Sequence, residues 1–141
     1  MEKLSPVTEK IMNERFGKDN VISLATAVNN VPYVRSVNAY YKNKAFYVIT
    51  YALSDKMKQL AGNPQCAVSG EWFTASGTGE NLGWFKSTEN ETLAANLRNA
   101  FAECIDNGHN NFDDPNCIIL KITLKNGVLF SKGTRYDIDF E

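Results

Sequence analysis

The stretch RSVNAYYKNKAFYVITYALSDKMKQL, residues 35–60, holds the end of one strand pattern, the whole of the next and the start of a short helix. Lys42-Asn43-Lys44 separates the two strand patterns, and a connection this short joins only antiparallel neighbours. Arg35 lies on the otherwise apolar first strand, and Ser54-Asp55-Lys56 opens the helix. The stretch therefore predicts an antiparallel sheet, and it raises the question of why two cations lie at these positions.

An amphipathic helix is expected over residues 6–16, upstream of this stretch. Ser5 is a good N-cap residue, Pro6 is favoured at the first helical position, and Gly17 ends the pattern. The apolar residues that recur on one face are Val7, Ile11, Met12 and Phe16. We expect this helix to form a lid on the core.

Three consecutive strands are expected after the helix. Residues 20–28 and 31–41 are apolar and rich in β-branched side chains, and Asn29-Asn30 between them is a tight-turn signal. Residues 45–51, AFYVITY, continue the strand pattern. Because the connections are so short, the three strands are predicted to form an antiparallel meander.

The second half of the chain returns to extended character after a short helix. This helix follows Leu53 and ends at Asn63-Pro64, and residues 66–83 then read as extended. Strongly bent strands suit a small barrel. The positions where bulges or bends are expected are Gly70, Gly77 and Gly79.

A further amphipathic helix is predicted to begin at Thr88, which forms a capping-box pattern with Glu91. Its apolar stripe consists of Leu93, Leu97, Ala100, Phe101 and Cys104. Strand patterns resume at residues 117–124 and 127–132. Together these elements predict about six strands and two or three helices, in a single mainly-β (α+β) barrel domain that spans residues 1–141.

Charge and composition exclude several classes of protein. The chain has 15 Lys and Arg against 16 Asp and Glu, so no global basic field is present to hold nucleic acid or an anionic membrane. The N-terminal residues carry charges every few positions and show no continuous apolar run, which argues against a secretory signal or a membrane span. We therefore expect a cytoplasmic protein in which any anion site is local.

The cysteines and the single histidine argue against a disulfide framework or a metal site. Cys66, Cys104 and Cys117 are odd in number and widely spaced, and His109 is the only imidazole. His109 lies in the polar stretch NGHNNFDDPN, where a solvated loop residue is expected. The cysteines are expected to be reduced and partly in the core.

The two cations of the opening stretch can be explained by a bound phosphate. Strand alternation puts Arg35 on the same face as Val37 and Ala39, which otherwise read as barrel wall. Ser54 at the N-cap leaves free N–H groups at the start of the helix, and the positive charge of Lys56 is unfavourable there. A phosphate would accept hydrogen bonds from all of these donors, and Arg35 would add a bidentate fork.

The same residues also have an ordinary structural interpretation. Ser54 is then a simple helix cap, Lys56 a solvated charge, and Arg35 the partner of a surface carboxylate. The aromatic residues of these strands can stack on a flat ligand, but on antiparallel strands they also serve as core or dimer contacts. These aromatic residues are Tyr33, Tyr40, Tyr41, Phe46, Tyr47 and Tyr51.

Taken together, several motifs of the chain resemble the flavin-mononucleotide-binding split barrels related to pyridoxamine 5'-phosphate oxidase. The resemblance covers nearly the whole chain, and it rests on the order and spacing of the motifs. They are VISLATA (21–27), P-x-V-R-S-V (32–37), AFYVIT (45–50), SDKMKQL (54–60) and NPQCAV (63–68). The resemblance implies a six-stranded antiparallel split β-barrel with two or three flanking helices, and FMN as cofactor.

The resemblance also implies which residues contact the flavin. Arg35 and the helix start Ser54-Asp55-Lys56 would face the phosphate and ribityl chain. On the neighbouring strands, Ser36, Val37 and Asn38 would run beside the isoalloxazine, and Ile49 and Thr50 would line the ribityl or phosphate side.

The later segments are more similar to the general-stress-protein branch of this family than to the oxidase itself. The segment GTGENL (77–82) is followed by a helix and then by FDDPNCIILKI (112–122). The oxidase's C-terminal arginine-x-histidine substrate motif is missing from the ending KGTRYDIDFE. Flavin binding is therefore implied, whereas the reaction on vitamin B6 phosphates is not.

Three functions remain open at this point. The first is an FMN-dependent oxidoreductase acting on a small molecule, in which the flavin does the redox chemistry and no side chain needs to be a general acid or base. The second is a stress protein that binds flavin without turnover. The third keeps the barrel and binds haem or a deazaflavin.

A symmetric homodimer with two flavin sites at its interface is also expected. A small barrel with this many aromatic and apolar strand residues has surface to bury, and twofold pairing is the commonest solution. The resemblance implies that strand 70–74 of one chain, with Trp72, covers the flavin held by Arg35 and Lys56 of the other.

Overall fold

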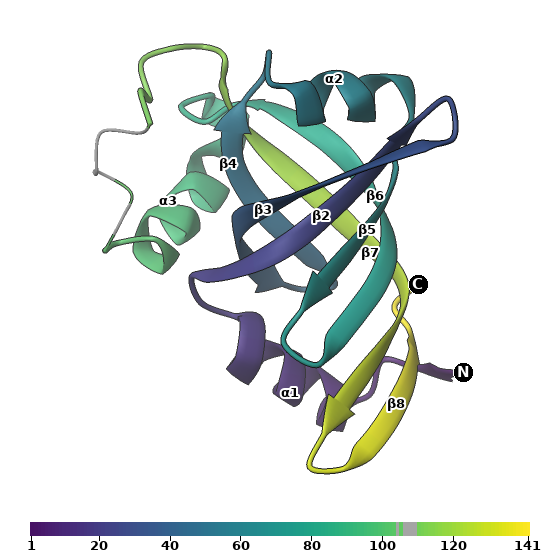
Figure 1. The fold of residues 1–141 in the computed structure, drawn as a ribbon. Coiled ribbons are helices and arrows are strands. Elements are labelled where there is room, and N and C mark those ends of the chain that lie inside the picture. Colours follow the sequence, from purple (N-terminus) through teal and green to yellow (C-terminus); the bar gives the residue numbers. More distant parts are fainter. Residues whose placement is uncertain (104, 106–109) are drawn as a thin grey trace.

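The computed structural model describes residues 1–103, 105 and 110–141 (Figure 1). Two of the residues considered in the sequence, Cys104 and His109, lie outside this range. In chain order, the elements are β1 (Glu2–Lys3), α1 (Pro6–Phe16), β2 (Asn20–Val28), β3 (Val31–Lys42), β4 (Ala45–Tyr51), α2 (Asp55–Gly62), β5 (Gln65–Gly70), β6 (Phe73–Trp84), the 3-10 helix η1 (Thr88–Asn90), α3 (Glu91–Ala100), β7 (Cys117–Ser131) and β8 (Thr134–Asp139).

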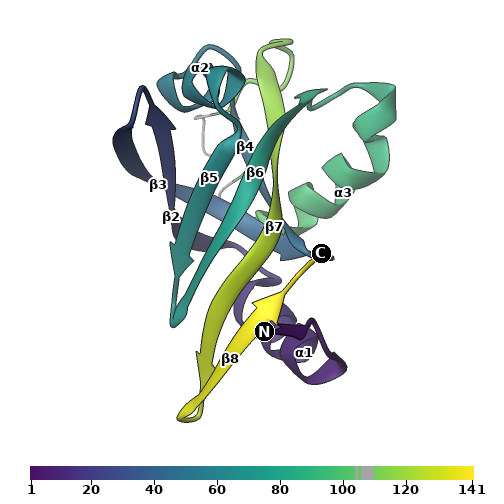
Figure 2. The same ribbon diagram turned by 90° about the vertical axis from the view of Figure 1, so that its right-hand side faces the viewer.

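Six of the strands close into an antiparallel barrel. The strands are hydrogen-bonded in the order β7-β4-β3-β2-β5-β6, and β6 returns to pair with β7. Within the described residues, two extra strands and three α-helices surround this barrel, which confirms the predicted mainly-β split-barrel architecture. Figures 1 and 2 show α2 over one end of the barrel, with α1 and β8 at the opposite end.

The N-terminal helix covers the lower end of the core, as predicted, but with a different face. Ser5 accepts a hydrogen bond from the Thr8 backbone N–H, and Met12 and Phe16 are buried. Val7, which was expected on the buried face, is 59% exposed. Thr8 takes its place, because it lies one helical turn before Met12 and its hydroxyl is satisfied by the capping box.

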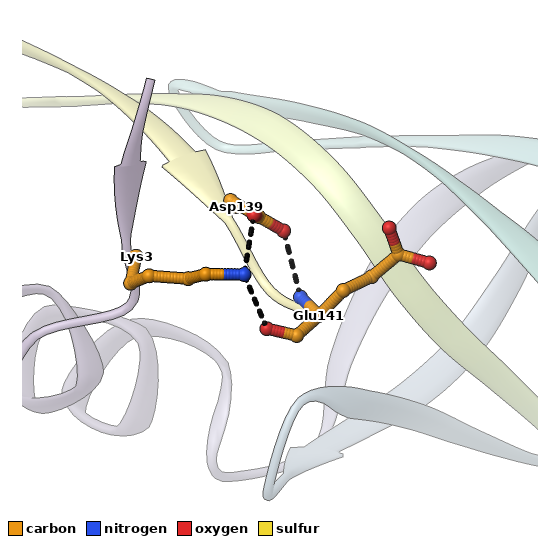
Figure 3. Close-up of polar contacts among 3 residues, drawn as sticks. All are labelled: Lys3, Asp139 and Glu141. Atoms are coloured by element: carbon orange, nitrogen blue, oxygen red, sulfur yellow. Dashed lines mark hydrogen bonds and ion pairs between the residues drawn. The ribbon is translucent and has the colours of Figure 1, made fainter.

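The two extra strands bring the chain termini side by side. β1 pairs with β8 in parallel, and neither strand was predicted from the sequence. The Lys3 Nζ lies 2.7 Å from an Asp139 carboxylate oxygen and donates to the Glu141 carbonyl oxygen at 3.1 Å (Figure 3). These contacts are exposed, so they fix the geometry of the ends more than they add to stability.

Two apolar clusters stabilise the domain. The larger one fills the barrel, where α1 and α2 add Phe16 and Leu60 to the inward strand residues. The smaller one joins Leu97 of α3 to Ile119 of β7 and the loop residue Phe85 on the outside of the barrel. None of the described helices combines the length and apolar character needed to cross a membrane.

Three local features differ from the sequence prediction. Residues 66–83 form a hairpin, because Glu71-Trp72 is a turn and residues 70–74 are not one strand. The two predicted strands 117–124 and 127–132 are one bent strand, β7. The expected Thr88–Glu91 capping box is absent, since Thr88 starts η1 and no side chain caps α3.

The cysteine and glycine predictions are partly confirmed. Cys66 and Cys117 are free and buried. The register of β6 against β7 shifts at Ser76/Gly77, as expected for a bulge. On β7, Gly127 lies so close to β6 that a Cβ there would lie 2.6 Å from the Thr74 carbonyl oxygen. Glycine is therefore required by a close approach of two backbones.

We expect Gly127→Ala to lower the free energy of unfolding by about 1–3 kcal/mol, because backbone atoms must move to admit the methyl group. The matched control is Gly62→Ala at the end of α2, where no heavy atom lies within 4 Å of the added Cβ. That variant should be stabilised by about 0.4–1 kcal/mol through the unfolded chain. Urea unfolding measures both, and equal effects of the two substitutions would contradict the close approach.

Candidate functional site

The barrel is split where β3 and β4 diverge. The two strands pair only at Tyr40–Tyr47, Tyr41–Phe46 and Lys42–Ala45. From Val31 to Ala39, the described pairing of β3 is with β2 alone, and β4 continues beside β7. The split therefore leaves one edge of each strand unpaired, at the predicted segments 36–38 and 49–50.

Only part of these predicted segments presents side chains outward. Ser36 and Asn38 are exposed, and the Asn38 amide donates to Asp19 at 3.0 Å. Val37 is 8% exposed and packs in the barrel core, so a ligand at the split would meet its backbone. Ile49 packs against the outer cluster beneath α3.

Arg35 lies on the barrel face of β3, as predicted, and its guanidinium is fixed beneath α2. Nη1 donates to the Thr26 hydroxyl at 2.8 Å and to the Leu24 carbonyl at 3.3 Å, and Nη2 donates to Gln59 Oε1 at 2.5 Å. The Thr26 hydroxyl also donates to Gln59 Oε1, at 2.6 Å. All of these acceptors are neutral, and no carboxylate within residues 1–103, 105 and 110–141 forms an ion pair with Arg35.

The N-terminus of α2 places a second cation near Arg35. Ser54 is the N-cap residue, Asp55 is exposed in the first turn, and Lys56 donates from Nζ to the Thr50 hydroxyl at 2.6 Å. Burial, and then the charge of Arg35, lower the pKa of Lys56. The two cations are therefore close enough to repel each other.

The Ser54 hydroxyl is buried and has no hydrogen-bond partner in the described structure. An N-cap serine normally accepts a hydrogen bond from the second or third N–H of its helix, but this side chain makes no such bond. A buried hydroxyl without a partner costs free energy. Two cations, a free hydroxyl and the N–H groups of a helix start together fit an anion with several oxygen atoms.

The structure thus brings Arg35, Thr50, Ser54 and Lys56 to one end of the split. Trp72 does not join them, because the β5–β6 turn that carries it lies away from α2, toward the other end of the barrel (Figures 1 and 2). Thr26 and Gln59, which hold Arg35, were not predicted. Thr26 follows Ile22 and Leu24 on the inward face of β2. A polar residue in this apolar series could have indicated that Thr26 has a polar partner inside the barrel.

A cavity of about 380 Å³ adjoins the site between the end of β4 and the loop before β7. Both the end of β4 and polar residues of that loop line it. Its lining consists of Ile49, Thr50, Tyr51, Asn110, Asn111, Asp114 and Cys117. Thr50 therefore lies between this cavity and Lys56.

Comparison with protein-family models and with curated proteins finds no match to this chain. Solved structures do match. A FAD-binding protein from Mesorhizobium loti has a TM-score of 0.67 at 16% identity, over 88% of this chain and 92% of that chain. General Stress Protein 26 from Bacillus anthracis has a TM-score of 0.67 at 16% identity, over 92% and 97%. A haem storage protein from Vibrio cholerae has a TM-score of 0.63 at 16% identity, over 87% and 91%.

At these identities, the likeness shows the fold. The chain has the split-barrel fold of the pyridoxamine 5'-phosphate oxidase-related proteins, which the motifs of its sequence predicted. General Stress Protein 26 shares this fold over nearly its whole length.

The unpartnered hydroxyl of Ser54 leads to an expectation for the ligand-free protein. Ser54→Ala should leave the free energy of unfolding unchanged or slightly higher, because it removes a buried group that makes no hydrogen bond. The matched control is Ser5→Ala at the N-cap of α1, where the hydroxyl does accept from Thr8 and its loss should cost about 1 kcal/mol. Urea unfolding at fixed protein concentration compares them, and equal losses would show that Ser54 is an ordinary cap.

Proposed function

We propose that this chain binds flavin mononucleotide at the split between β3 and β4 and uses it in a redox reaction on a small molecule. The observation that carries the proposal is the buried, unpartnered Ser54 hydroxyl at the start of α2, with Lys56 in the first turn of that helix and Arg35 on the strand beneath it. A phosphate would give the hydroxyl a partner and remove the repulsion between Lys56 and Arg35. A solved structure of the same fold is a FAD-binding protein, which supports a flavin as the class of ligand.

Each residue of the site has a definite part in this proposal. Lys56, Ser54 and the free N–H groups of α2 hold the phosphate, and Thr50 orients the Lys56 ammonium. Arg35 adds its charge from a guanidinium that Gln59 and Thr26 already hold in place, so little side-chain freedom is lost on binding.

The strand edges exposed by the split support the rest of the cofactor. Ser36 and Asn38 contribute side chains, and Val37 contributes backbone groups, beside the ring system. Ile49 and Thr50 lie on the opposite edge. When bound, the flavin supplies the electron or hydride transfer, while the protein supplies position and exclusion of water.

A haem or deazaflavin binder is the second candidate, because a haem storage protein shares the fold. Haem iron takes axial ligands such as His, Cys or Tyr, and the only histidine, His109, lies outside the described residues. The visible spectrum of the purified protein separates flavin, deazaflavin and haem. Anaerobic titration with reduced nicotinamides then separates a redox enzyme from a stress protein that binds flavin without turnover.

The proposed active form is a symmetric homodimer with one flavin held between the two chains at each site. A groove of about 460 Å³ runs across the outer face of β2, β5, β6 and β7, where small side chains let another surface approach closely. Val34 at its border is 71% exposed. Because the β5–β6 turn lies away from α2 in one chain, an inverted second copy can bring Trp72 over the flavin held by Arg35 and Lys56.

We expect Arg35→Ala and Lys56→Ala each to weaken FMN binding roughly tenfold to hundredfold, because each removes a charge-assisted contact worth about 1.5–3 kcal/mol. Calorimetry with FMN and riboflavin measures the effect. Lys58→Ala is the matched control, since Lys58 is an exposed lysine of the same helix.

The comparison of FMN with riboflavin tests whether the phosphate is the group that the protein binds. The wild-type chain should bind riboflavin more weakly than FMN, and this difference should be smaller in the Lys56 variant. FAD should also bind worse than FMN, since the sequence has no Gly-rich cradle for a second phosphate. Unchanged FMN affinity in the Arg35/Lys56 double variant would refute the phosphate site.

We expect Trp72→Ala to lower FMN affinity and dimer stability together, because the ring would contact the flavin of the other chain. Because FMN would then bind the dimer more tightly than the monomer, FMN should shift the monomer–dimer equilibrium toward dimer. Sedimentation velocity with and without FMN measures both. Trp84→Phe is the control, because Trp84 donates to the Phe112 carbonyl on the α3 side of the barrel. A monomer that binds FMN with full affinity would exclude the cross-chain site.

A further inference from the structure

The turn that carries Trp72 is unfavourable by itself. Glu71-Trp72 is a two-residue turn between Gly70 and Phe73, and Trp72 has φ of +51°. This left-handed conformation favours Gly or Asn, and a bulky side chain rarely adopts it. Trp72 is also 67% exposed. A tryptophan that is both exposed and at a positive φ is typical of a contact site, and the surrounding structure must hold its turn in place.

Arg15, at the end of α1, is the side chain that holds this turn. Its Nη1 donates to the Glu71 carbonyl oxygen at 3.1 Å and to the Phe130 carbonyl oxygen at 3.0 Å. The Phe130 N–H donates to the Trp72 carbonyl at 2.9 Å, and the two rings meet edge to face with centroids 6.3 Å apart. One guanidinium nitrogen thus ties the turn on one hairpin to the neighbouring strand β7.

Arg15 lies next to the barrel core. It precedes Phe16, which is buried in the barrel core, and its guanidinium lies 6.0 Å from the centroid of that ring. A cation in the last turn of a helix is also favourable to the helix. Arg15 therefore links the core-packed end of α1 to the turn, at the end of the barrel remote from α2 (Figure 1).

We infer that Arg15 is a positioning residue for the flavin site of the second copy, where it holds the Glu71-Trp72 turn so that Trp72 is presented in one orientation. This inference rests on the proposed function. Arg15 itself touches no cofactor in this arrangement, because its hydrogen bonds go to backbone carbonyls of its own chain. Without Arg15, the turn loses two hydrogen bonds, and Trp72 must be ordered when the flavin binds, which weakens binding.

The first test needs no flavin. In a Trp84→Phe background, Trp72 is the only tryptophan, so its time-resolved fluorescence anisotropy reports the motion of this turn. Arg15→Ala should increase the fast local component, and Arg15→Lys should increase it less, since an ammonium can still donate to carbonyls. Lys10→Ala, an exposed residue of the same helix, is the control and should change nothing. A Trp72 as rigid in Arg15→Ala as in the parent overturns the inference.

The second test is a double-mutant cycle on FMN affinity. Arg15→Ala and Trp72→Ala should each raise the dissociation constant roughly three- to tenfold, as expected for one aromatic contact. Because Arg15 acts through Trp72, the double variant should bind no worse than Trp72→Ala alone. Additive losses would mean that Arg15 acts on binding by another route, and would overturn the inference.

The two tests separate this inference from the function on which it rests. If FMN does not bind, or if Trp72→Ala has no effect on FMN affinity, the proposed cross-chain site fails whatever the anisotropy shows. If Trp72→Ala weakens binding but Arg15→Ala changes neither anisotropy nor affinity, the positioning role alone fails. Arg15→Lys keeps the charge, so it supplies both measurements if the alanine variant does not fold.

Discussion

The separation of β3 from β4 after three residue pairs is the constraint on which the candidate site depends. Strands that stay paired would satisfy each other's backbone groups and leave no edge for a ligand. Here the chain closes the barrel elsewhere, through β6 and β7, so the gap does not cost the domain its core. The site can therefore have open edges on a closed and rigid scaffold.

The polar network beneath α2 joins that helix to two strands of the barrel. Gln59 of α2 accepts from Arg35 of β3 and from Thr26 of β2, so a helix and two strands meet at one amide oxygen. Because Gln59 and Thr26 are neutral, the network fixes the guanidinium of Arg35 without cancelling its charge. The same contacts that join α2 to the barrel thus preserve a positive potential next to Lys56.

The two ends of the barrel differ in what they expose. The α2 end holds two cations and an unpartnered buried hydroxyl, whereas the opposite end presents Trp72 at a positive φ that a bulky side chain rarely adopts. Each feature costs the isolated chain some stability, and each is supported by an arginine that donates to carbonyl or amide oxygens of its own chain. A twofold pairing that brings unlike ends together would satisfy both at once, which is the arrangement the proposed function uses.

The sequence by itself determined the local elements that build the barrel. Hydrophobic alternation, tight-turn residues and helix caps act over a few residues, so β2, β3, β4, α1 and α2 were predictable. The face of Arg35 and the N-cap position of Ser54 followed from the same periodicities. Only the tertiary structure decided that Thr26 and Gln59 hold Arg35, that the Ser54 hydroxyl is left without a partner, and that Glu71-Trp72 is a turn clamped by Arg15. Those outcomes depend on contacts between residues far apart in the chain, and no local pattern records which distant groups will meet.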